Sequence, residues 1–215
     1  MSSVIRHPLI PKAILLLWRY IFLIALGMGC ATSYVFAKPN VVIVLADDLG
    51  WNDVSYHGSE IATPTIDNLA ENGIELDRFY SQPTCTPPRA ALMTGTTPMR
   101  LGILGPLSDR TATGLPLSEK LLPQYFKENG YSTYLVGKWH LGFRQKEYLP
   151  TARGFDHFYG HLTGGVGYWD HVHGGGLDWQ RNGETVYETG YATDLEADEA
   201  IRLLAAHDKN KPFFM

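Results

Sequence analysis

Two kinds of apolar pattern alternate along this chain. Residues 40–46 form a continuous apolar and β-branched run, which is typical of a strand buried on both faces of a parallel sheet. Apolar residues spaced three and four apart predict helices over residues 63–73, 118–130 and 192–207. Further strands are expected at residues 74–80, 131–136 and 211–215. This alternation of strands and helices predicts an α/β sandwich with a mainly parallel central sheet.

The first 37 residues have the pattern of a signal peptide. Basic residues come first, an apolar run over residues 20–37 follows, and Val35 and Ala37 occupy the offsets expected before a cleavage site. An uncleaved membrane anchor is the alternative, because this run is near the lower limit of about 17 residues for a membrane span. We therefore expect export to a periplasmic, secreted or lysosome-like location. The globular part is expected to be residues 38–215.

Composition limits the functions that the globular part can have. The chain of 215 residues is 45% hydrophobic and 19% charged, an ordinary globular composition that suffices for one core. Of its 18 basic and 22 acidic side chains, three basic and no acidic ones lie in the first 37 residues, which leaves 15 against 22 and a balance of −7. A nucleic-acid-binding face is therefore not expected.

Cys85 has the most informative surroundings. If the signal peptide is removed, Cys30 is lost with it and Cys85 has no partner for an internal disulfide. Two prolines and a run of helix formers follow, and Gly95 supplies a stop, so Cys85 is expected just before the N-terminus of a short helix. Such a terminus attracts anions and lowers the pKa of a thiol, and Arg89 can reach the same anion. A buried, inert cysteine is the alternative.

Two adjacent carboxylates, Asp47 and Asp48, come directly after the first apolar run. Sites in open α/β sheets lie beyond the carboxyl ends of strands. Adjacent carboxylates repel each other unless a cation lies between them, and their hard oxygen atoms suit Ca²⁺ or Mg²⁺. The pair is a candidate metal site, with a turn or capping role as the alternative. Asp53, shortly after it, is interpreted as structural.

Lys138 and His140 follow the strand expected over residues 131–136. Because residues two apart in an extended chain share a face, both side chains are expected to point one way and Trp139 the other. An ammonium group neutralises anionic oxygen atoms, and an imidazole can move a proton near neutral pH. A surface lysine beside a hydrogen-bonded core histidine is the alternative.

These motifs together resemble the sulfatase family. The family's signature, C-x-P-x-R followed by T-G, is reproduced by Cys85, Pro87, Arg89, Thr94 and Gly95. Its opening motif and its second motif are matched by residues 45–53 and 137–142. Milder similarities to the arylsulfatase B branch, which acts on sulfated N-acetylgalactosamine in glycosaminoglycans, lie at residues 50–54, 82–87, 121–123 and 149–156.

The resemblance implies an alkaline-phosphatase-like fold and sulfuric ester hydrolysis. In the family a formylglycine-generating or sulfatase-maturing enzyme oxidises the cysteine, so the resemblance implies a formylglycine at Cys85 whose hydrate attacks sulfur. It also implies one divalent ion, usually Ca²⁺, held by Asp47, Asp48 and the group at position 85. The expected substrate is a sulfated carbohydrate or other small molecule, such as an aryl sulfate.

The resemblance also assigns roles to the basic residues. Arg89 would orient the hydrate and offset its charge, and Lys138 would contact the sulfate group. His140 would hydrogen-bond a hydroxyl of the hydrate and deprotonate it. Sulfatases supply further site residues later in their chains, so residues 38–215 are expected to be the N-terminal part of a longer catalytic domain, incomplete at the C-terminus and inactive alone.

Other functions stay open on the same residues. Some members of the superfamily hydrolyse phosphonates or phosphodiesters. A non-catalytic anion- or carbohydrate-binding chain would keep the basic and acidic residues but leave Cys85 unmodified. The pair His171 and His173 would need a third ligand to bind zinc, so residues 168–176 are interpreted as a glycine-rich rim loop. Within that loop, Trp169 and His171 are candidate substrate contacts.

Overall fold

Proline marks the start of three α-helices in residues 38–215, the part of the chain that the computed structural model describes. Proline fits the first turn because its missing N–H would have no helical partner there. The α-helices are α2 (Pro64–Asn72), α3 (Thr86–Thr94), α4 (Leu122–Glu128) and α5 (Ala192–Ala206). The helices predicted over residues 63–73 and 192–207 are confirmed. The helix predicted over residues 118–130 begins only at Leu122, where Pro123 occupies the first turn and Gln124 caps the N–H of Leu121 at 2.7 Å.

A mixed sheet forms the centre of the described chain. Its strands are β1 (Ser132–Val136), β2 (His157–Gly160), β5 (Gln180–Arg181), β6 (Glu184–Thr185) and β7 (Phe213–Phe214), in the order β6-β5-β2-β1-β7. Both neighbours of β1 run parallel to it, in agreement with the parallel sheet that was predicted, although no strand was predicted at β2. The strands β5 and β6, which were not predicted either, add an antiparallel edge. A separate hairpin pairs β3 (Val172–His173) with β4 (Gly176–Leu177).

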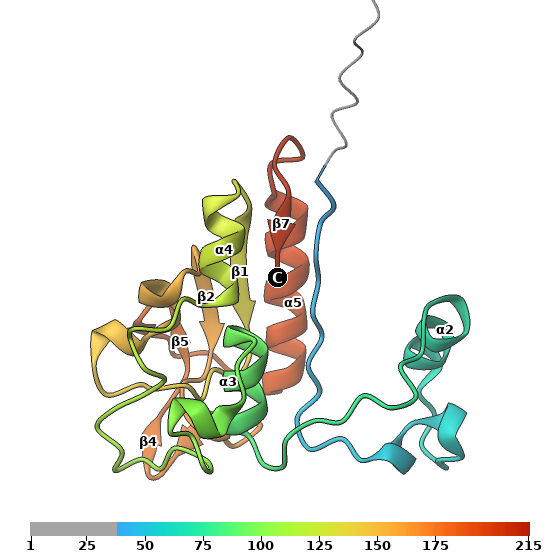
Figure 1. Cartoon of the computed structure of the whole chain (residues 1–215), viewed down its shortest axis with the longest axis horizontal. Helices are drawn as coiled ribbons and strands as arrows, with labels where there is room; N and C mark the ends of the chain where they lie inside the picture. Colours follow the sequence, from blue (N-terminus) through green and yellow to red (C-terminus); the bar gives the residue numbers. More distant parts are fainter. Residues whose placement is uncertain (1–37) are drawn as a thin grey trace, which may run out of the picture. The chain divides into compact units, whose positions relative to one another are not determined.

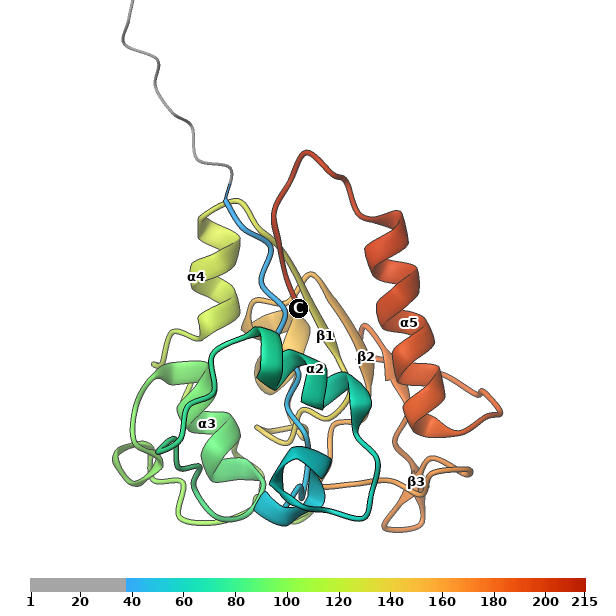
Figure 2. The same cartoon turned by 90° about the vertical axis from the view of Figure 1, so that its right-hand side faces the viewer.

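Helices cover both faces of this sheet. In Figure 2, α4 and α5 lie on opposite sides of β1 and β2, and both helices contact β1. Figure 1 shows α3 next to the end of α4, and these two helices are in contact. The arrangement confirms the α/β sandwich. Single-turn 3₁₀ helices lie in the connections, at Trp51–Asp53, Ser55–His57, Pro98–Leu101, Lys146–Tyr148 and Pro150–Arg153.

The main core lies between the sheet and the helices α3 and α4. Trp139, Leu121 and Phe158 are each at most 2% exposed there. Phe126 of α4 stacks on Phe214 of β7 with ring centroids 4.3 Å apart. A smaller cluster contains Trp179. These contacts hold the loops that leave the carboxyl ends of β1 and β2.

Residues 40–46 do not form the doubly buried strand that their composition predicts. Val41 makes a parallel bridge with Phe214, and the N–H of Ile43 donates to the carbonyl of Met215 at 2.8 Å. Beyond these contacts Val44 is 87% exposed. Burial on both faces needs a strand on each side and cover from both layers, and within residues 38–215 this run pairs with β7 on one side.

The strand predicted over residues 74–80 is also wrong. Ile74 and Tyr80 are 90% and 85% exposed, and the segment joins no ladder in the described chain. Apolar residues make a strand only when another strand accepts their backbone hydrogen bonds. The predicted strands at residues 131–136 and 211–215 are confirmed as β1 and β7.

The segment interpreted as a signal peptide or anchor, residues 1–37, lies outside the described residues. Within residues 38–215, no helix combines the length and the apolar character needed to cross a membrane.

Candidate active site

Cys85 lies at the N-cap of α3, as the sequence predicts. Its thiol is free, it is half-buried, and its side chain makes no capping hydrogen bond. The next residue, Thr86, is fully buried and ties this terminus to two loops. Its Oγ1 donates to the carbonyl of His140 at 3.1 Å and accepts from the N–H of Leu107 at 3.1 Å. The helix end that carries Cys85 is therefore fixed against the loop that follows β1.

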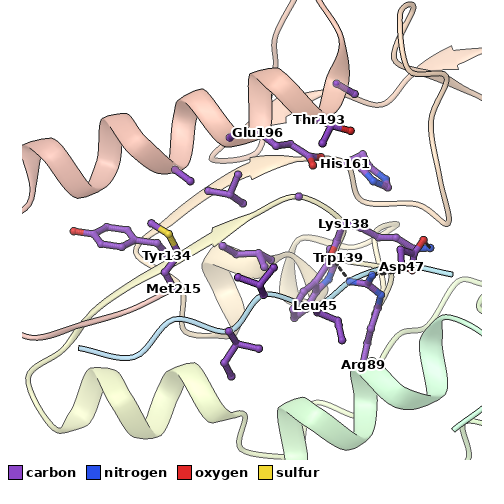
Figure 3. Close-up of a pocket in the computed structure, with 18 of the residues that line it drawn as sticks. Leu45, Asp47, Arg89, Tyr134, Lys138, Trp139, His161, Thr193, Glu196 and Met215 are labelled. Carbon is purple, nitrogen blue, oxygen red and sulfur yellow. Dashed lines mark hydrogen bonds and ion pairs between the residues drawn. The ribbon is translucent and has the colours of Figure 1, made fainter. Parts of the chain in front are cut away.

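Two buried cations, Arg89 of α3 and Lys138 after β1, form an ion-pair cluster with the exposed Asp47 (Figure 3). Arg89 Nη2 lies 3.0 Å from Asp47 Oδ1, and Lys138 Nζ lies 2.7 Å from Asp47 Oδ2. Arg89 Nη1 also donates to the carbonyl of Lys138 at 2.7 Å. Both cations are only 9% exposed. Burial acts to raise the pKa of Asp47, but the hydrogen bonds and charges of the two cations outweigh it and lower that pKa below its ordinary value.

Asp47, Asp48 and Cys85 meet at one point. One carboxylate oxygen of each aspartate and the sulfur of Cys85 all lie within 4.8 Å of one another. Asp48 has a φ of 56°, in the left-handed region that aspartate tolerates better than most residues. Two hard carboxylate ligands suit Ca²⁺ or Mg²⁺, whereas a thiolate does not, and an oxygen atom in place of the sulfur would complete a consistent set. The donor atoms therefore fit the divalent ion of the sulfatase resemblance when position 85 carries oxygen.

His140 is buried and has one nitrogen without a partner in the described chain. Its Nε2 lies 2.9 Å from the carbonyl of Leu107, while Nδ1 has no hydrogen-bond partner within residues 38–215. Burial lowers the pKa of His140 below its ordinary value; the hydrogen bond to Leu107 opposes this, and the positive charges of Lys138 and Arg89 reinforce it. Gly164 packs against the ring, because a Cβ at that position would come within 3.0 Å of it.

The alternation predicted for residues 138–140 holds only in part. Trp139 is 2% exposed and packs into the core, where its Nε1 donates to the carbonyls of Gly142 and Tyr148 at 3.0 and 2.9 Å. Lys138 points away from the core to Asp47. His140, however, has a φ of 55°, so the chain is not extended there and the two-residue period does not apply.

A cavity of about 850 Å³ opens beside the ion-pair cluster. Asp47, Arg89 and Lys138 line one part of it, and Figure 3 shows His161, Thr193 and Glu196 across from them. His161 follows β2 and is 7% exposed, and Glu196 and Thr193 project from α5. Burial lowers the pKa of His161 to about 4 and raises that of Glu196 to about 7.

No sequence motif pointed to these wall residues. His161 is found only from the pairing of β2 with β1, whose register places it opposite Lys138. Nothing in the local sequence marks Glu196 as a site residue, although it lies on the face of α5 that lines the cavity, one turn from Ala192 and Ala200.

Other residues singled out from the sequence have structural roles. Asp53 accepts a hydrogen bond from the N–H of Gly50 at 2.7 Å, as the structural interpretation predicts. The prediction that His171 contacts substrate is wrong, because this side chain is 1% exposed and stacks on Trp179. His173 pairs with Asp109 at 3.0 Å, so the two histidines do not form a zinc site. Trp169 is 72% exposed and tilts against a tyrosine ring at the rim.

An acidic pair, the cysteine motif at Cys85 and two buried cations thus meet on this α/β fold. The structure of Ps i-CgsB matches the chain with a TM-score of 0.77 at 36% identity, over 83% of this chain and 44% of that one. The structure of BT4656 in complex with its substrate, D-glucosamine-2-N,6-O-disulfate, matches with a TM-score of 0.66 at 32% identity, over 83% of this chain and 33% of that one.

The chain belongs to the sulfatase family, whose sequence model matches residues 39–215. It is 43% identical over 188 residues to arylsulfatase J of Mus musculus, a match that covers 83% of this chain and 31% of that protein. The alkaline-phosphatase-like fold predicted from the resemblance is thereby confirmed. The chain spans between about a third and a half of the length of these relatives.

Proposed function

We propose that the whole protein hydrolyses sulfate esters and that Cys85 is converted to formylglycine for this purpose. The observation that carries the proposal is the meeting of Asp47, Asp48 and Cys85 within 4.8 Å, beside two buried cations. The hydrated aldehyde would supply the nucleophilic oxygen, and a bound Ca²⁺ would polarise the sulfate group. Asp47, Asp48 and the group at position 85 would hold the ion.

The charges of the site suit a sulfate group. Asp47 and Asp48 balance Arg89 and Lys138, so a divalent cation between them would leave a net charge of +2. A sulfate ester carries one negative charge, and a positive, partly buried pocket attracts it. Lys138 would neutralise a sulfate oxygen as a point charge, while Arg89 would hold Asp47 and the N-terminal end of α3 in place.

His140 would handle a proton at its free Nδ1. A neutral imidazole can accept a proton, and burial, which lowers the pKa of His140, favours that neutral form. Its carbonyl is already tied to Thr86, next to Cys85. We assign His140 the role of the base that takes a proton from a hydroxyl at position 85.

The remaining expectations extend this proposal to the whole protein. We propose that residues 1–37 direct export, that a sulfatase-maturing enzyme modifies Cys85, and that residues 38–215 are the N-terminal part of a longer catalytic domain. The substrate would be a sulfated carbohydrate, a proposal supported by the disulfated glucosamine named for BT4656.

The test combines a chemical and a kinetic measurement on the whole protein, produced together with a maturing enzyme. Peptide mass spectrometry should show that the Cys85 peptide has lost one sulfur and two hydrogens and gained one oxygen. The same preparation should hydrolyse an aryl sulfate in the presence of Ca²⁺. Cys85→Ser should remove the activity without lowering the melting temperature, because the thiol makes no capping hydrogen bond.

Three results would contradict the proposal. Faster turnover of a phosphonate or phosphodiester than of any sulfate ester would favour the related hydrolases of the superfamily. An unmodified thiol, with binding of sulfated sugars and no turnover, would favour a binding protein. An active Cys85→Ala variant would exclude residue 85 as the source of the nucleophile.

A further inference from the structure

His161 lies beside Lys138, although it belongs to no motif. β1 and β2 pair in parallel with Val136 opposite Tyr159, and the same register places Lys138 opposite His161. The pairing continues past the strands, since the N–H of Trp139 donates to the carbonyl of His161 at 3.0 Å. Both Lys138 and His161 line the same cavity. His161 is therefore a neighbour of the cation proposed to contact the sulfate group.

The loop that carries His161 is held rigidly. Asp178 is 8% exposed, and its carboxylate accepts the N–H groups of Leu162 and Thr163, at 3.1 and 2.8 Å, and the hydroxyl of Thr163 at 2.6 Å. A side chain that binds a ligand is most effective when its own position is already fixed. His161 meets this condition because its backbone is anchored on both sides.

The ring of His161 has hydrogen-bonding capacity that the described chain does not use. It is 7% exposed, and its Nδ1 has no hydrogen-bond partner within residues 38–215. A buried polar atom left without a partner costs free energy, so such atoms mark places where a ligand or water binds. Figure 3 shows the ring at the cavity wall, close to Glu196 and Thr193 of α5 and across from Asp47 and Arg89.

We infer that His161 and Glu196 form a hydrogen-bonding subsite for the hydroxyl groups of a sugar whose sulfate group is held at Arg89 and Lys138. This inference rests on the proposed sulfatase function. It gives a role in substrate binding to the cavity wall that lies across from Arg89 and Asp47. Burial keeps His161 uncharged at neutral pH because it lowers the pKa of the ring, and it leaves Glu196 protonated in part because it raises the pKa of the carboxyl. A neutral imidazole offers one donor and one acceptor, and a protonated carboxyl adds an O–H donor, so both groups can pair with hydroxyl groups, which donate and accept.

The test compares two substrates of the whole, matured protein. A sulfated monosaccharide offers hydroxyl groups to the subsite, whereas a simple aryl sulfate offers none. His161→Phe and Glu196→Leu should each lower kcat/KM for the sugar sulfate by roughly 10- to 100-fold, because a hydrogen bond to a buried polar group is lost. The aryl sulfate should be hydrolysed within about twofold of the parent rate.

Two control variants separate recognition from structural damage. Glu196→Gln keeps a hydrogen-bonding amide and should restore most of the sugar activity. Asp194→Asn, on the exposed side of α5, should leave both substrates unaffected. Equal losses on the two substrates, or a sugar activity that is unchanged in both variants, would overturn the inference.

The subsite can still be tested if the parent protein hydrolyses neither substrate. In that case the proposed function fails, and binding of the unsulfated monosaccharide is measured by saturation-transfer NMR instead. Binding to the parent that is lost in His161→Phe and kept in Asp194→Asn would support the subsite. Equal binding to all three proteins, or none to the parent, would contradict it.

Discussion

Two helices of equal length, α2 and α3, differ completely in what surrounds them. Each has nine residues and a proline in its first turn. In α2 no residue is buried, and Leu69 is 66% exposed. In α3 four residues are buried, and Arg89 and Thr86 bond to the backbone of the loop after β1. The helical conformation is therefore a local property in both, whereas burial depends on what distant parts of the chain supply.

The same contrast separates two larger regions. Residues 42–80, which we call the α2 region, expose most of their large apolar side chains, among them Val44 and Ile74. Residues 85–215, the packed region, contain the main core and most of the candidate site. Asp47 connects the two, since it belongs to the α2 region but pairs with Arg89 and Lys138. The site thus depends on the attachment of one exposed segment to a packed framework.

The largest effect is expected from breaking that attachment. Arg89→Met removes the partner of Asp47 Oδ1 and of the Lys138 carbonyl. Loss of a charged donor at the reacting site should lower kcat by about 10²- to 10³-fold. Arg89→Lys keeps the charge but loses one of the two hydrogen bonds, and its kcat should fall between those of the parent and Arg89→Met. Steady-state kinetics of the matured whole protein measures this.

A matched substitution in α2 controls for general damage. Asp67→Asn removes a charge from a side chain bonded to Ser55 and Thr63 within the α2 region. It should leave kcat within about twofold, because Asp67 bonds within its own region and shares no partner with the site. Similar losses for Arg89→Met and Asp67→Asn would contradict the division into two regions.

A core substitution should distinguish the regions by stability. Leu121 is 0% exposed in the main core, so Leu121→Ala should lower the free energy of unfolding by about 2–5 kcal/mol. Leu69→Ala, on the exposed stripe of α2, should cost no more than about 0.5 kcal/mol in the same chain. Urea unfolding followed by circular dichroism measures both values.

The same two substitutions can be compared in the 215-residue chain and in the whole, longer protein. If the rest of a longer catalytic domain covers α2, Leu69→Ala should cost as much there as a core substitution. A small cost in both proteins would show that the apolar stripe of α2 is exposed in the functional enzyme as well.

Elements with strong local signals could be predicted from the sequence. Proline, helix formers and a terminal glycine define α3, and β-branched residues define β1, so both were found. Residues 40–46 were predicted as a strand buried on both faces, but in the described chain only Val41 bridges to β7, because burial requires strands and helices from elsewhere. The short antiparallel strands β5 and β6 have no apolar alternation to reveal them.

The candidate site divides in the same way. Cys85, Asp47 and Lys138 lie in contiguous motifs, and the structure brings all three together. His161 and Glu196 became visible only through the register of β2 and the docking of α5, which are long-range features. Their functional assignment, like that of the motif residues, is a prediction for experiment.

Charged groups extend the comparison to pH. Glu199 of α5 is 5% exposed and bonds to Arg202 and His157, and its pKa is lowered to about 2, first by the hydrogen bonds from Arg202. A carboxyl with a lowered pKa stabilises the fold fully above its unfolded pKa of about 4.5, and this stabilisation is lost as the pH falls toward 2. The free energy of unfolding of the parent falls with acid partly for this reason. In Glu199→Gln that fall should be smaller by about 2–3 kcal/mol.

Exposed Glu71 of α2 supplies the control for this measurement. Glu71→Gln should change the free energy of unfolding by less than about 0.5 kcal/mol at every pH. Urea unfolding at a series of pH values between neutrality and the acid limb gives both curves. An acid limb that keeps its full slope in Glu199→Gln would show that other carboxyls dominate acid unfolding.

The smallest expected effect concerns how the two helices end. α3 ends at Gly95, which has a φ of 66° and open space where a Cβ would lie. Alanine at this position would meet no clash but would have to adopt a left-handed conformation, so Gly95→Ala should lower the free energy of unfolding by about 1 kcal/mol. Gly95→Asn should cost less, because asparagine adopts this conformation more readily. α2 ends at Gly73 with a φ of −114°, where a Cβ would meet the carbonyl oxygen of Leu69 at 2.6 Å. There asparagine should give no advantage over alanine, because the obstacle is a clash. The measurement compares the melting temperatures of the alanine and asparagine variants at Gly95 and at Gly73. If asparagine is better tolerated than alanine by the same amount at both positions, the two helices end by the same mechanism.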